Sequence, residues 1–368
     1  MAILRWCKKN IVFCVAAAAA VITACFVPPD GAYLGYFDWK TLACLFLTLA
    51  VVCALRNIKF FTIVARRLVK ISGNLRSLFL MLIAITFLGS MLIANDMALI
   101  TFLPLGYFAL SVTKQEKYMA YLFILQNISA NLGGMLTPFG NPQNLYLYSY
   151  FNIPTGEFCA IMLPPFLLAI TLLVLCCLPI KATPLVIEDS FKERLNKKRT
   201  LLYLVLFALS LLIVFRVIPY WIGLVLITGV LLWKDREALL MVDYGLLGTF
   251  FFFFIFAGNL ARIDVVNEVI SALLAKDTLL VSVLSCQSIS NVPTAILLSQ
   301  FTEDYRSLLL GVNIGGTGTL IASLASLITF SEFRVLYPGH SKQYFWMFTA
   351  INAGFLVVMT VAAKFFFV

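Results

Sequence analysis

Two stretches of this 368-residue chain carry polar residues whose types could bind an ion, and the stretches match each other. Residues 131–144 read NLGGMLTPFGNPQN, and residues 313–326 read NIGGTGTLIASLAS. At an offset of 182 residues they pair amides, hydroxyls and glycines, namely Asn131 with Asn313, Gly133 and Gly134 with Gly315 and Gly316, Thr137 with Thr319, Asn141 with Ser323, and Asn144 with Ser326. Such side chains supply neutral oxygens and N–H donors, which suit sodium or a carboxylate.

The glycines and prolines in these stretches predict helices that are interrupted within the membrane. Paired glycines let the chain unwind, and Pro138 and Pro142 prevent it from rewinding. An interrupted helix leaves free carbonyl oxygens at one end and free N–H groups at the other, which is tolerated where they face a ligand or a wet cavity. Carbonyl ends coordinate cations, whereas N–H ends carry about half a positive charge and attract anions.

An apolar segment with a polar interruption precedes each stretch. Residues 77–112 are interrupted by Asn95 and Asp96, and residues 277–302 by Ser288, Ser290, Asn291 and Pro293, where Asn291 corresponds to Asn95. Of the 17 carboxylates in the chain, Asp96 alone falls well inside an apolar segment. Because an acid within the membrane is costly, we interpret Asp96 as a cation ligand or a proton acceptor.

Each of these features also has a purely structural interpretation. A glycine pair in a membrane helix is commonly a close-packing site, and a single polar side chain there commonly bonds to a neighbouring helix. Asn95 and Asp96 could simply cap the helix that follows. The functional interpretation is favoured because four polar, helix-breaking clusters occur at equivalent places in the two halves of the chain.

The composition indicates an all-α polytopic membrane protein. Apolar residues make up 62% of the chain, charged residues 12%, and the mean hydropathy is +0.99, which excludes a soluble globule. We expect re-entrant hairpins at 77–112 and 277–302 and broken helices at 118–148 and 307–331. The remaining predicted spans are 11–27, 40–55, 158–180, 200–216, 217–233, 244–260 and 344–366, which have lengths near those that cross a bilayer.

The basic residues predict the orientation of the chain. If both hairpins double back, 21 of the 27 Lys and Arg residues fall on one side, which is the cytoplasmic side by the positive-inside rule. The other side holds Lys40, Arg216, Arg262, Lys276, Arg306 and Lys364. We therefore expect a cytoplasmic N-terminus, an external C-terminus and an inner-membrane location. The net charge of +10 then reflects topology rather than binding to nucleic acid.

The matching halves predict an inverted-topology repeat. Residues 1–180 form the first repeat, 181–199 a cytoplasmic connector, and 200–368 the second repeat, which enters from the opposite face because an odd number of crossings separates the copies. An amphipathic helix along the cytoplasmic interface is predicted at 56–73, with a similar stretch at 261–275 on the outer side. The alternative is that both stretches merely link spans. Inverted repeats with broken helices are typical of secondary transporters, whose sites lie at the midplane between the repeats.

Other classes of protein are disfavoured by what the sequence lacks. The nine cysteines form no CxxC pair, and the single histidine, His340, falls in a predicted turn. Without an HExxH motif or a second acid inside a span, an intramembrane enzyme has no catalytic constellation. A channel remains an alternative, as does a secretory signal at the basic, alanine-rich N-terminus.

The chain resembles the ion transporter superfamily, which includes citrate and dicarboxylate/sodium symporters, arsenite permeases and NhaD-type antiporters. The segment from Gly133 to Asn144 is similar to the unwound-helix motif of the dicarboxylate symporters, and Ser290-Asn291 to the start of their Ser-Asn-Thr hairpin tip. Asn95-Asp96 is more similar to the Asn-Asp of arsenite permeases, and Val292 stands where the symporters have Thr. The first half has one scaffold span fewer than the second.

The resemblance implies a scaffold domain and a transport domain, an elevator-like movement and a homodimer. It implies one cation site in each repeat, with the anion between the hairpin tips. The implied substrate and ion site comprises Asn95, Asp96, Gly134, Thr137, Asn141, Asn144, Ser290, Asn291, Thr294, Gly316, Thr317, Thr319 and Ser323. Sodium would be held at Asn95, Asp96, Asn141, Asn291 and Ser323.

We expect a secondary transporter of a small anion, coupled to Na+ or H+ and needing no cofactor beyond that ion. A di- or tricarboxylate such as citrate or succinate is the leading substrate. The alternative is an arsenite-type anion permease or an Na+/H+ antiporter, which Asp96 favours.

Overall fold

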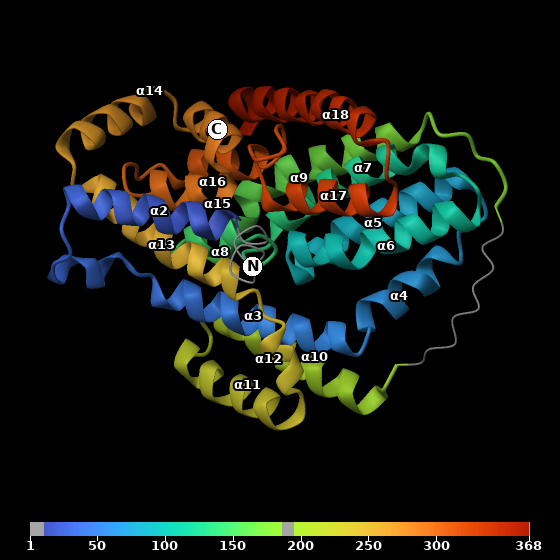
Figure 1. Ribbon diagram of the computed structural model, residues 1–368, viewed down its shortest axis with the longest axis horizontal. Helices are drawn as coiled ribbons and strands as arrows, with labels where there is room; N and C mark the ends of the chain where they lie inside the picture. The colour runs from blue at the N-terminus through green and yellow to red at the C-terminus, as the bar shows by residue number, and fades with distance from the viewer. Residues whose placement is uncertain (1–10, 186–194, 368) are drawn as a thin grey trace.

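The computed structural model describes residues 11–185 and 195–367, and within these ranges the secondary structure is helical. Seven helices in the described ranges are long and apolar enough to cross a membrane. Two shorter apolar helices, α2 (Ile11–Phe26) and α11 (Tyr220–Lys234), accompany them. The prediction of an all-α polytopic membrane protein is confirmed (Figure 1).

The first half of the chain begins with scaffold helices and continues into the elements that hold the predicted site. After α2 come a 3-10 turn at Gly31–Tyr36, α3 (Trp39–Asn57) and α4 (Phe60–Val69). The predicted hairpin forms α5 (Leu75–Ile93) and α6 (Asn95–Val112). The predicted broken helix forms α7 (Met119–Gly133), a 3-10 turn at Gly134–Leu136, and α8 (Pro142–Tyr150), and α9 (Thr155–Cys177) follows.

The second half follows a similar order. It contains α10 (Lys197–Val214), α11, the short α12 (Arg236–Leu240) and α13 (Tyr244–Ala261). Next come α14 (Asp264–Ile289) and α15 (Asn291–Leu298), then α16 (Tyr305–Ile314) and α17 (Leu324–Leu336). The last helix, α18 (Ser341–Ala362), ends in a π-helical turn at Ala363–Phe367.

The structure refines several expected boundaries. The helix expected at 56–73 covers Phe60–Val69 alone. Helix α14 contains both the stretch expected at 261–275, which begins only at Asp264, and the first arm of the second hairpin. The two parts meet at a kink where Asp277 has non-helical dihedrals. Part of the connector expected at 181–199 lies outside the described residues. In its described part, Pro184 forms an isolated antiparallel bridge with Asn74, beside the N-terminus of α5.

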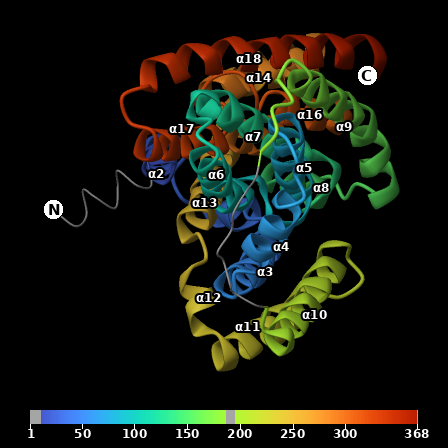
Figure 2. The same ribbon diagram turned by 90° about the vertical axis from the view of Figure 1, so that its right-hand side faces the viewer.

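Helices from the two halves are interleaved. Helix α2 packs along α13 from the second half, while α3 packs against α10 and α11, also from the second half. Helices α5, α6 and α7 pack together, as do α14, α15 and α16. Figures 1 and 2 both show α10 and α11 on one side of the molecule and α18 on the opposite side, with the hairpins and broken helices between them.

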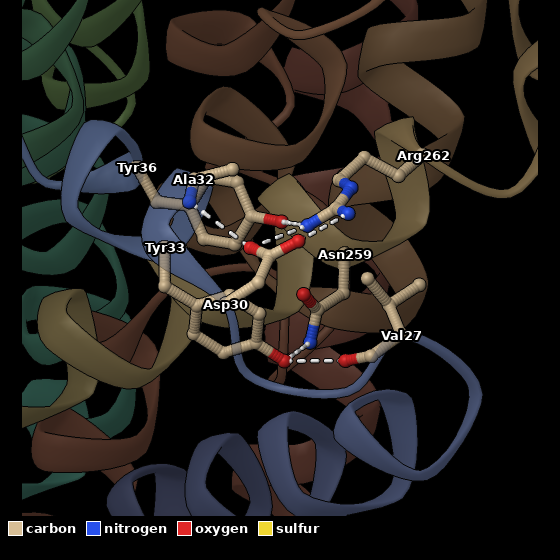
Figure 3. A network of polar contacts seen from close by, with 7 residues as sticks. All are labelled: Val27, Asp30, Ala32, Tyr33, Tyr36, Asn259 and Arg262. Atoms are coloured by element: carbon tan, nitrogen blue, oxygen red, sulfur yellow. Dashed lines mark hydrogen bonds and ion pairs between the residues drawn. The ribbon is translucent and has the colours of Figure 1, made fainter.

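A polar network fastens the loop after α2 to the C-terminal end of α13 (Figure 3). Arg262 and Asp30 form a bidentate ion pair, with Nη2–Oδ2 and Nη1–Oδ1 distances of 2.7 and 3.0 Å, and Arg262 also donates to Tyr36. Asn259 Nδ2 donates to Tyr33 Oη at 2.9 Å, and Tyr33 donates in turn to the Val27 carbonyl at 2.6 Å. The network therefore holds the first described helix against the second half of the chain.

Candidate functional site

The two hairpin tips have the same backbone conformation. Ala94, between α5 and α6, has φ 63° and ψ 151°, and Ser290, between α14 and α15, has φ 73° and ψ 159°. Positive φ at residues other than glycine costs roughly 1–3 kcal/mol and tends to occur at functional sites. In each tip the following asparagine, Asn95 or Asn291, accepts a hydrogen bond at 2.9 Å from the next backbone N–H. The matching asparagines thus begin the second arm of each hairpin in the same way.

A threonine joins each interrupted helix to its own hairpin. Thr137 Oγ1 donates to the Met91 carbonyl at 2.8 Å, and Thr319 Oγ1 donates to the Gln287 carbonyl at 3.1 Å. Met91 and Gln287 each lie four residues before the tip asparagine. The equivalence of Thr137 and Thr319 in the sequence is therefore matched by equivalent contacts in space.

Amide side chains connect the two broken helices at a buried crossing. Asn313 Nδ2 in α16 donates to Asn144 Oδ1 in α8 at 2.6 Å, and Asn141 Nδ2 donates to Asn313 Oδ1 at 3.2 Å. The other two parts of the broken helices, α7 and α17, are also connected, because Asn127 Nδ2 in α7 donates to Ser326 Oγ in α17 at 3.2 Å. The contacts run in both directions between the halves, so Asn141 and Asn144 lie together with residues of the second stretch.

The first unwound segment is held close to its own helix. Asn144 Nδ2 lies 3.1 Å from the Met135 carbonyl oxygen and 3.3 Å from that of Gly134. A Cβ added at Gly134 would collide with Asn141 Oδ1 and would lie 2.7 Å from the Gly140 carbonyl oxygen. The close approach of the segment to Asn141 thus requires glycine at position 134.

Four buried acceptor oxygens in the first hairpin and first broken helix lack a hydrogen-bond partner among the described residues: Asp96 Oδ1, Gln126 Oε1, Asn141 Oδ1 and Gln143 Oε1. Buried polar atoms are usually bonded, so unpartnered oxygens call for an explanation such as a bound ion. Asp96 lies in the first turn of α6, where the helix dipole favours a negative charge. Each of these oxygens can accept a bond from a cation or a donor, and the Asp96 carboxylate can also take up a proton.

Other predicted residues use their hydroxyls within their own segments. Thr294 donates to the Ser290 carbonyl at 2.7 Å, and Thr317 donates to the Ile314 carbonyl at 2.7 Å. The Ser323 hydroxyl caps α17 by accepting from Ser326 N at 3.2 Å. Gly316 lies against the second tip, because an added Cβ would be 3.0 Å from Asn291 Nδ2.

Sequence reasoning missed Gln287, Asn127, Gln143 and Arg216. Gln287 bonds to the second unwound segment, Asn127 to α17, and Gln143 Nε2 lies 3.5 Å from Asn313 Oδ1. Arg216 donates to the Tyr148 and Ile153 carbonyls at the end of α8 and lies over the Tyr148 ring at 4.2 Å. Helical spacing could have indicated two of them. Asn127 lies four residues before Asn131, and Gln287 lies four residues before Asn291, so helical spacing would place each on the same face as a polar residue already singled out.

Within the described ranges, no three His, Cys, Asp or Glu side chains cluster as metal ligands. The matched segments instead carry neutral amides and hydroxyls, with the Asp96 carboxylate at the first hairpin tip. Among the described residues, seven helices could cross a membrane. Interrupted helices that meet within the fold are typical of secondary transporters. The fold and site therefore define the protein as a polytopic membrane transporter.

The chain belongs to the citrate transporter family, whose family model matches residues 1–303. An uncharacterized transporter of Methanocaldococcus jannaschii is 37% identical over 295 residues, which cover 79% of this chain and 80% of the relative. The inner membrane protein YbiR of Escherichia coli is 30% identical over 324 residues, covering 84% and 82%. A silicon efflux transporter of Oryza sativa subsp. japonica is 32% identical over 164 residues, covering 44% and 33%.

These likenesses confirm the resemblance to the ion transporter superfamily. They also confirm that the protein is a multi-pass membrane transporter rather than an enzyme.

Proposed function

We propose that the protein is a secondary active transporter that couples Na+ or H+ to the movement of a small anion, with a di- or tricarboxylate such as citrate or succinate as substrate. The observation that carries the proposal is the set of unpartnered buried oxygens at Asp96, Asn141 and Gln143. They lie in the hairpin and broken helix of the first half, where neutral and acidic oxygens suit a cation.

The anion part of the proposal is supported by helix N-termini. Helices α6 and α15 begin at the hairpin tips, and α8 and α17 begin after the unwound segments. Free N–H groups at such ends attract anions. The name of the family, citrate transporter, agrees with a carboxylate substrate.

The alternative is an arsenite-type anion permease or an Na+/H+ antiporter. Asp96 supports it, because a carboxylate at a hairpin tip could exchange a proton for a cation. A relative named as a silicon efflux transporter supports outward movement. The alternative differs from the leading proposal in the direction of transport and in the substrate that is moved.

The same proposal includes an inner-membrane location with a cytoplasmic N-terminus, an inverted repeat, a homodimer and an elevator-like movement of the hairpins and broken helices. The matched contacts of Thr137 and Thr319 support the repeat. The relative named as an inner membrane protein supports the location.

Uptake into proteoliposomes tests the function. Labelled citrate and succinate are offered with an inward Na+ gradient, an inward H+ gradient or neither. We expect gradient-driven uptake in the wild type and loss of cation dependence in Asp96→Asn, which keeps the side-chain shape but removes the charge. Size-exclusion chromatography checks that this variant is folded. Absence of carboxylate flux under both gradients, with arsenite or Na+/H+ exchange present, would favour the alternative.

A further inference from the structure

The two hairpins differ in the residue whose backbone carbonyl accepts from the threonine of the unwound segment. Met91 and Gln287 occupy equivalent positions, since their carbonyls accept from Thr137 and Thr319 respectively. The Met91 thioether has no hydrogen-bond donor, whereas Gln287 has an amide with two N–H donors and a carbonyl oxygen. The repeats are therefore chemically unequal at the place where each hairpin meets its broken helix.

The Gln287 amide is fully engaged by the second unwound segment. Its Nε2 donates to the carbonyls of Gly315 at 2.9 Å and Thr317 at 3.1 Å, and it also contacts the Val283 carbonyl at 3.1 Å. Its Oε1 accepts from Thr319 N at 2.9 Å. These bonds replace the helical bonds that the chain loses on unwinding. The carbonyl oxygens of Gly315 and Thr317 are therefore bonded to a side chain of the hairpin. In the first half the Gly134 and Met135 carbonyls are likewise bonded, by Asn144 of the same broken helix, so the acceptors that stay free there are side-chain oxygens.

The backbone of the segment is shaped around Gln287. Gly318 has φ +114°, a conformation that favours glycine, and a Cβ added there would collide with Gln287 Oε1. The segment therefore encloses the amide rather than leaving an open place beside it.

The hairpin tips show the same inequality. Asp96 follows Asn95 in the first tip, whereas the apolar Val292 follows Asn291 in the second. All four unpartnered buried oxygens of the hairpins and broken helices, within the described residues 75–150 and 277–336, belong to the first half. In the second half, the Ser323 hydroxyl, which corresponds to Asn141, is bonded to Ser326. Free acceptors and negative charge thus occur together in one repeat.

We propose that the coupling cation binds in the first repeat alone, and that the Gln287 amide takes the place that a second cation would need. This inference rests on the proposed function and differs from the expectation of one cation site per repeat. Gln287 is then a positioning residue, whose amide holds the second unwound segment through its bonds to Gly315, Thr317 and Thr319. One cation would accompany each substrate.

The number of cations moved per substrate tests the inference in the wild-type protein. Labelled succinate or citrate is loaded into proteoliposomes, and the gradient of Na+ or H+, whichever drives uptake, is varied until net flux reverses. The reversal point gives the ratio of cation to substrate. A ratio of one is expected, and a ratio of two overturns the inference while leaving the proposed function intact. Absence of driven flux under both gradients removes the proposed function and this inference with it.

A matched pair of variants tests the role of the two equivalent positions. Met91→Gln introduces an amide beside the first unwound segment, and we expect it to abolish cation dependence as Asp96→Asn does. Gln287→Met removes the amide from the second segment, and we expect dependence on the cation to persist. Loss of dependence in Gln287→Met together with its retention in Met91→Gln would overturn the inference. Melting temperatures of both variants show that the comparison is made on folded protein, and the wild-type ratio stands independently of either variant.

Discussion

At the scale of single residues, asparagine side chains connect the two halves at the centre of the molecule. A neutral amide offers both donors and acceptors, so it can be buried without the desolvation cost of a charge. Asn313 illustrates the result, because it donates to Asn144 and accepts from Asn141. Asp96 differs in its charge: its buried Oδ1 has no donor among the described residues, which is also true of Asn141 Oδ1 and Gln143 Oε1. The amides therefore build the framework that joins the halves, and the carboxylate is the group whose charge can respond to a cation.

Gly134 provides a prediction at the same scale. In Gly134→Ala the new methyl group would collide with Asn141 Oδ1 and lie 2.7 Å from the Gly140 carbonyl oxygen, so the unwound segment must move. Overpacking of this kind costs about 1–3 kcal/mol. We expect a lower melting temperature and reduced transport.

The control for Gly134→Ala is Gly354→Ala in α18, where an added Cβ would meet nothing within 4 Å. Alanine at this helical position should leave the melting temperature equal or slightly raised, because alanine favours a helix more than glycine does. Equal melting temperatures and equal transport in both variants would contradict the steric argument.

At the scale of elements, the sequence indicated where helices break but not how the breaks are held. Glycine pairs and prolines mark the unwound segments because they act locally on the backbone. Asn95 and Asp96 marked the first tip, yet the residue with positive φ is Ala94, whose type gives no such signal. The role of Gln287 depends on contacts with residues 315–319, and composition and spacing do not specify such long-range contacts.

The kink of α14 and the end of α8 also depend on contacts that the sequence pattern does not specify. The kink at Asp277 separates a continuous helical pattern into two parts, and Lys364 from the end of the chain lies 2.5 Å from its carboxylate. Arg216, assigned from the sequence only to the outer side, caps the end of α8. Both arrangements arise from packing between distant segments, which single-sequence patterns do not encode.

The polar network between the loop after α2 and the end of α13 gives a prediction about the contact between these two elements, which depends on the ion pair of Asp30 and Arg262. Hydrogen bonding to Arg262 holds the pKa of Asp30 below its ordinary value. Because the folded pKa is lowered, the stabilisation is present above the ordinary pKa and is lost as pH falls through the folded pKa. We expect Asp30→Asn to melt below the wild type at neutral pH, with the difference shrinking at acidic pH.

This prediction is checked by measuring melting temperatures of both proteins from neutral pH downwards in a constant detergent. The pair is exposed, so salt should also reduce the difference. Asp264→Asn serves as a control, because Asp264 lies at the nearby start of α14 and forms no ion pair among those found in the described residues. A difference for Asp30→Asn that is independent of pH would show that the carboxylate charge is not the cause.

At the scale of the whole molecule, the elements that precede the two hairpins lie far apart. Figure 1 shows α4 at the right of the view and the first part of α14 at the upper left, at opposite ends of the long axis. In an inverted repeat the two would lie at opposite faces of the membrane, as the proposed topology requires. The basic residues agree, since α4 carries Arg66 and Arg67 whereas the first part of α14 carries Lys276 alone.

Thiol labelling in intact cells tests this orientation. Lys276→Cys and Lys342→Cys are introduced into a cysteine-free background, because both lysines are exposed and lie beside the kink of α14 and at the start of α18 respectively. With 21 of 27 basic residues assigned to the cytoplasmic side, a membrane-impermeant maleimide should label position 276 in intact cells and position 342 only after permeabilisation. The reverse pattern would invert the proposed topology, and labelling of both positions from outside would contradict the topology of the second half, because one crossing, the broken helix at 307–331, is expected between them.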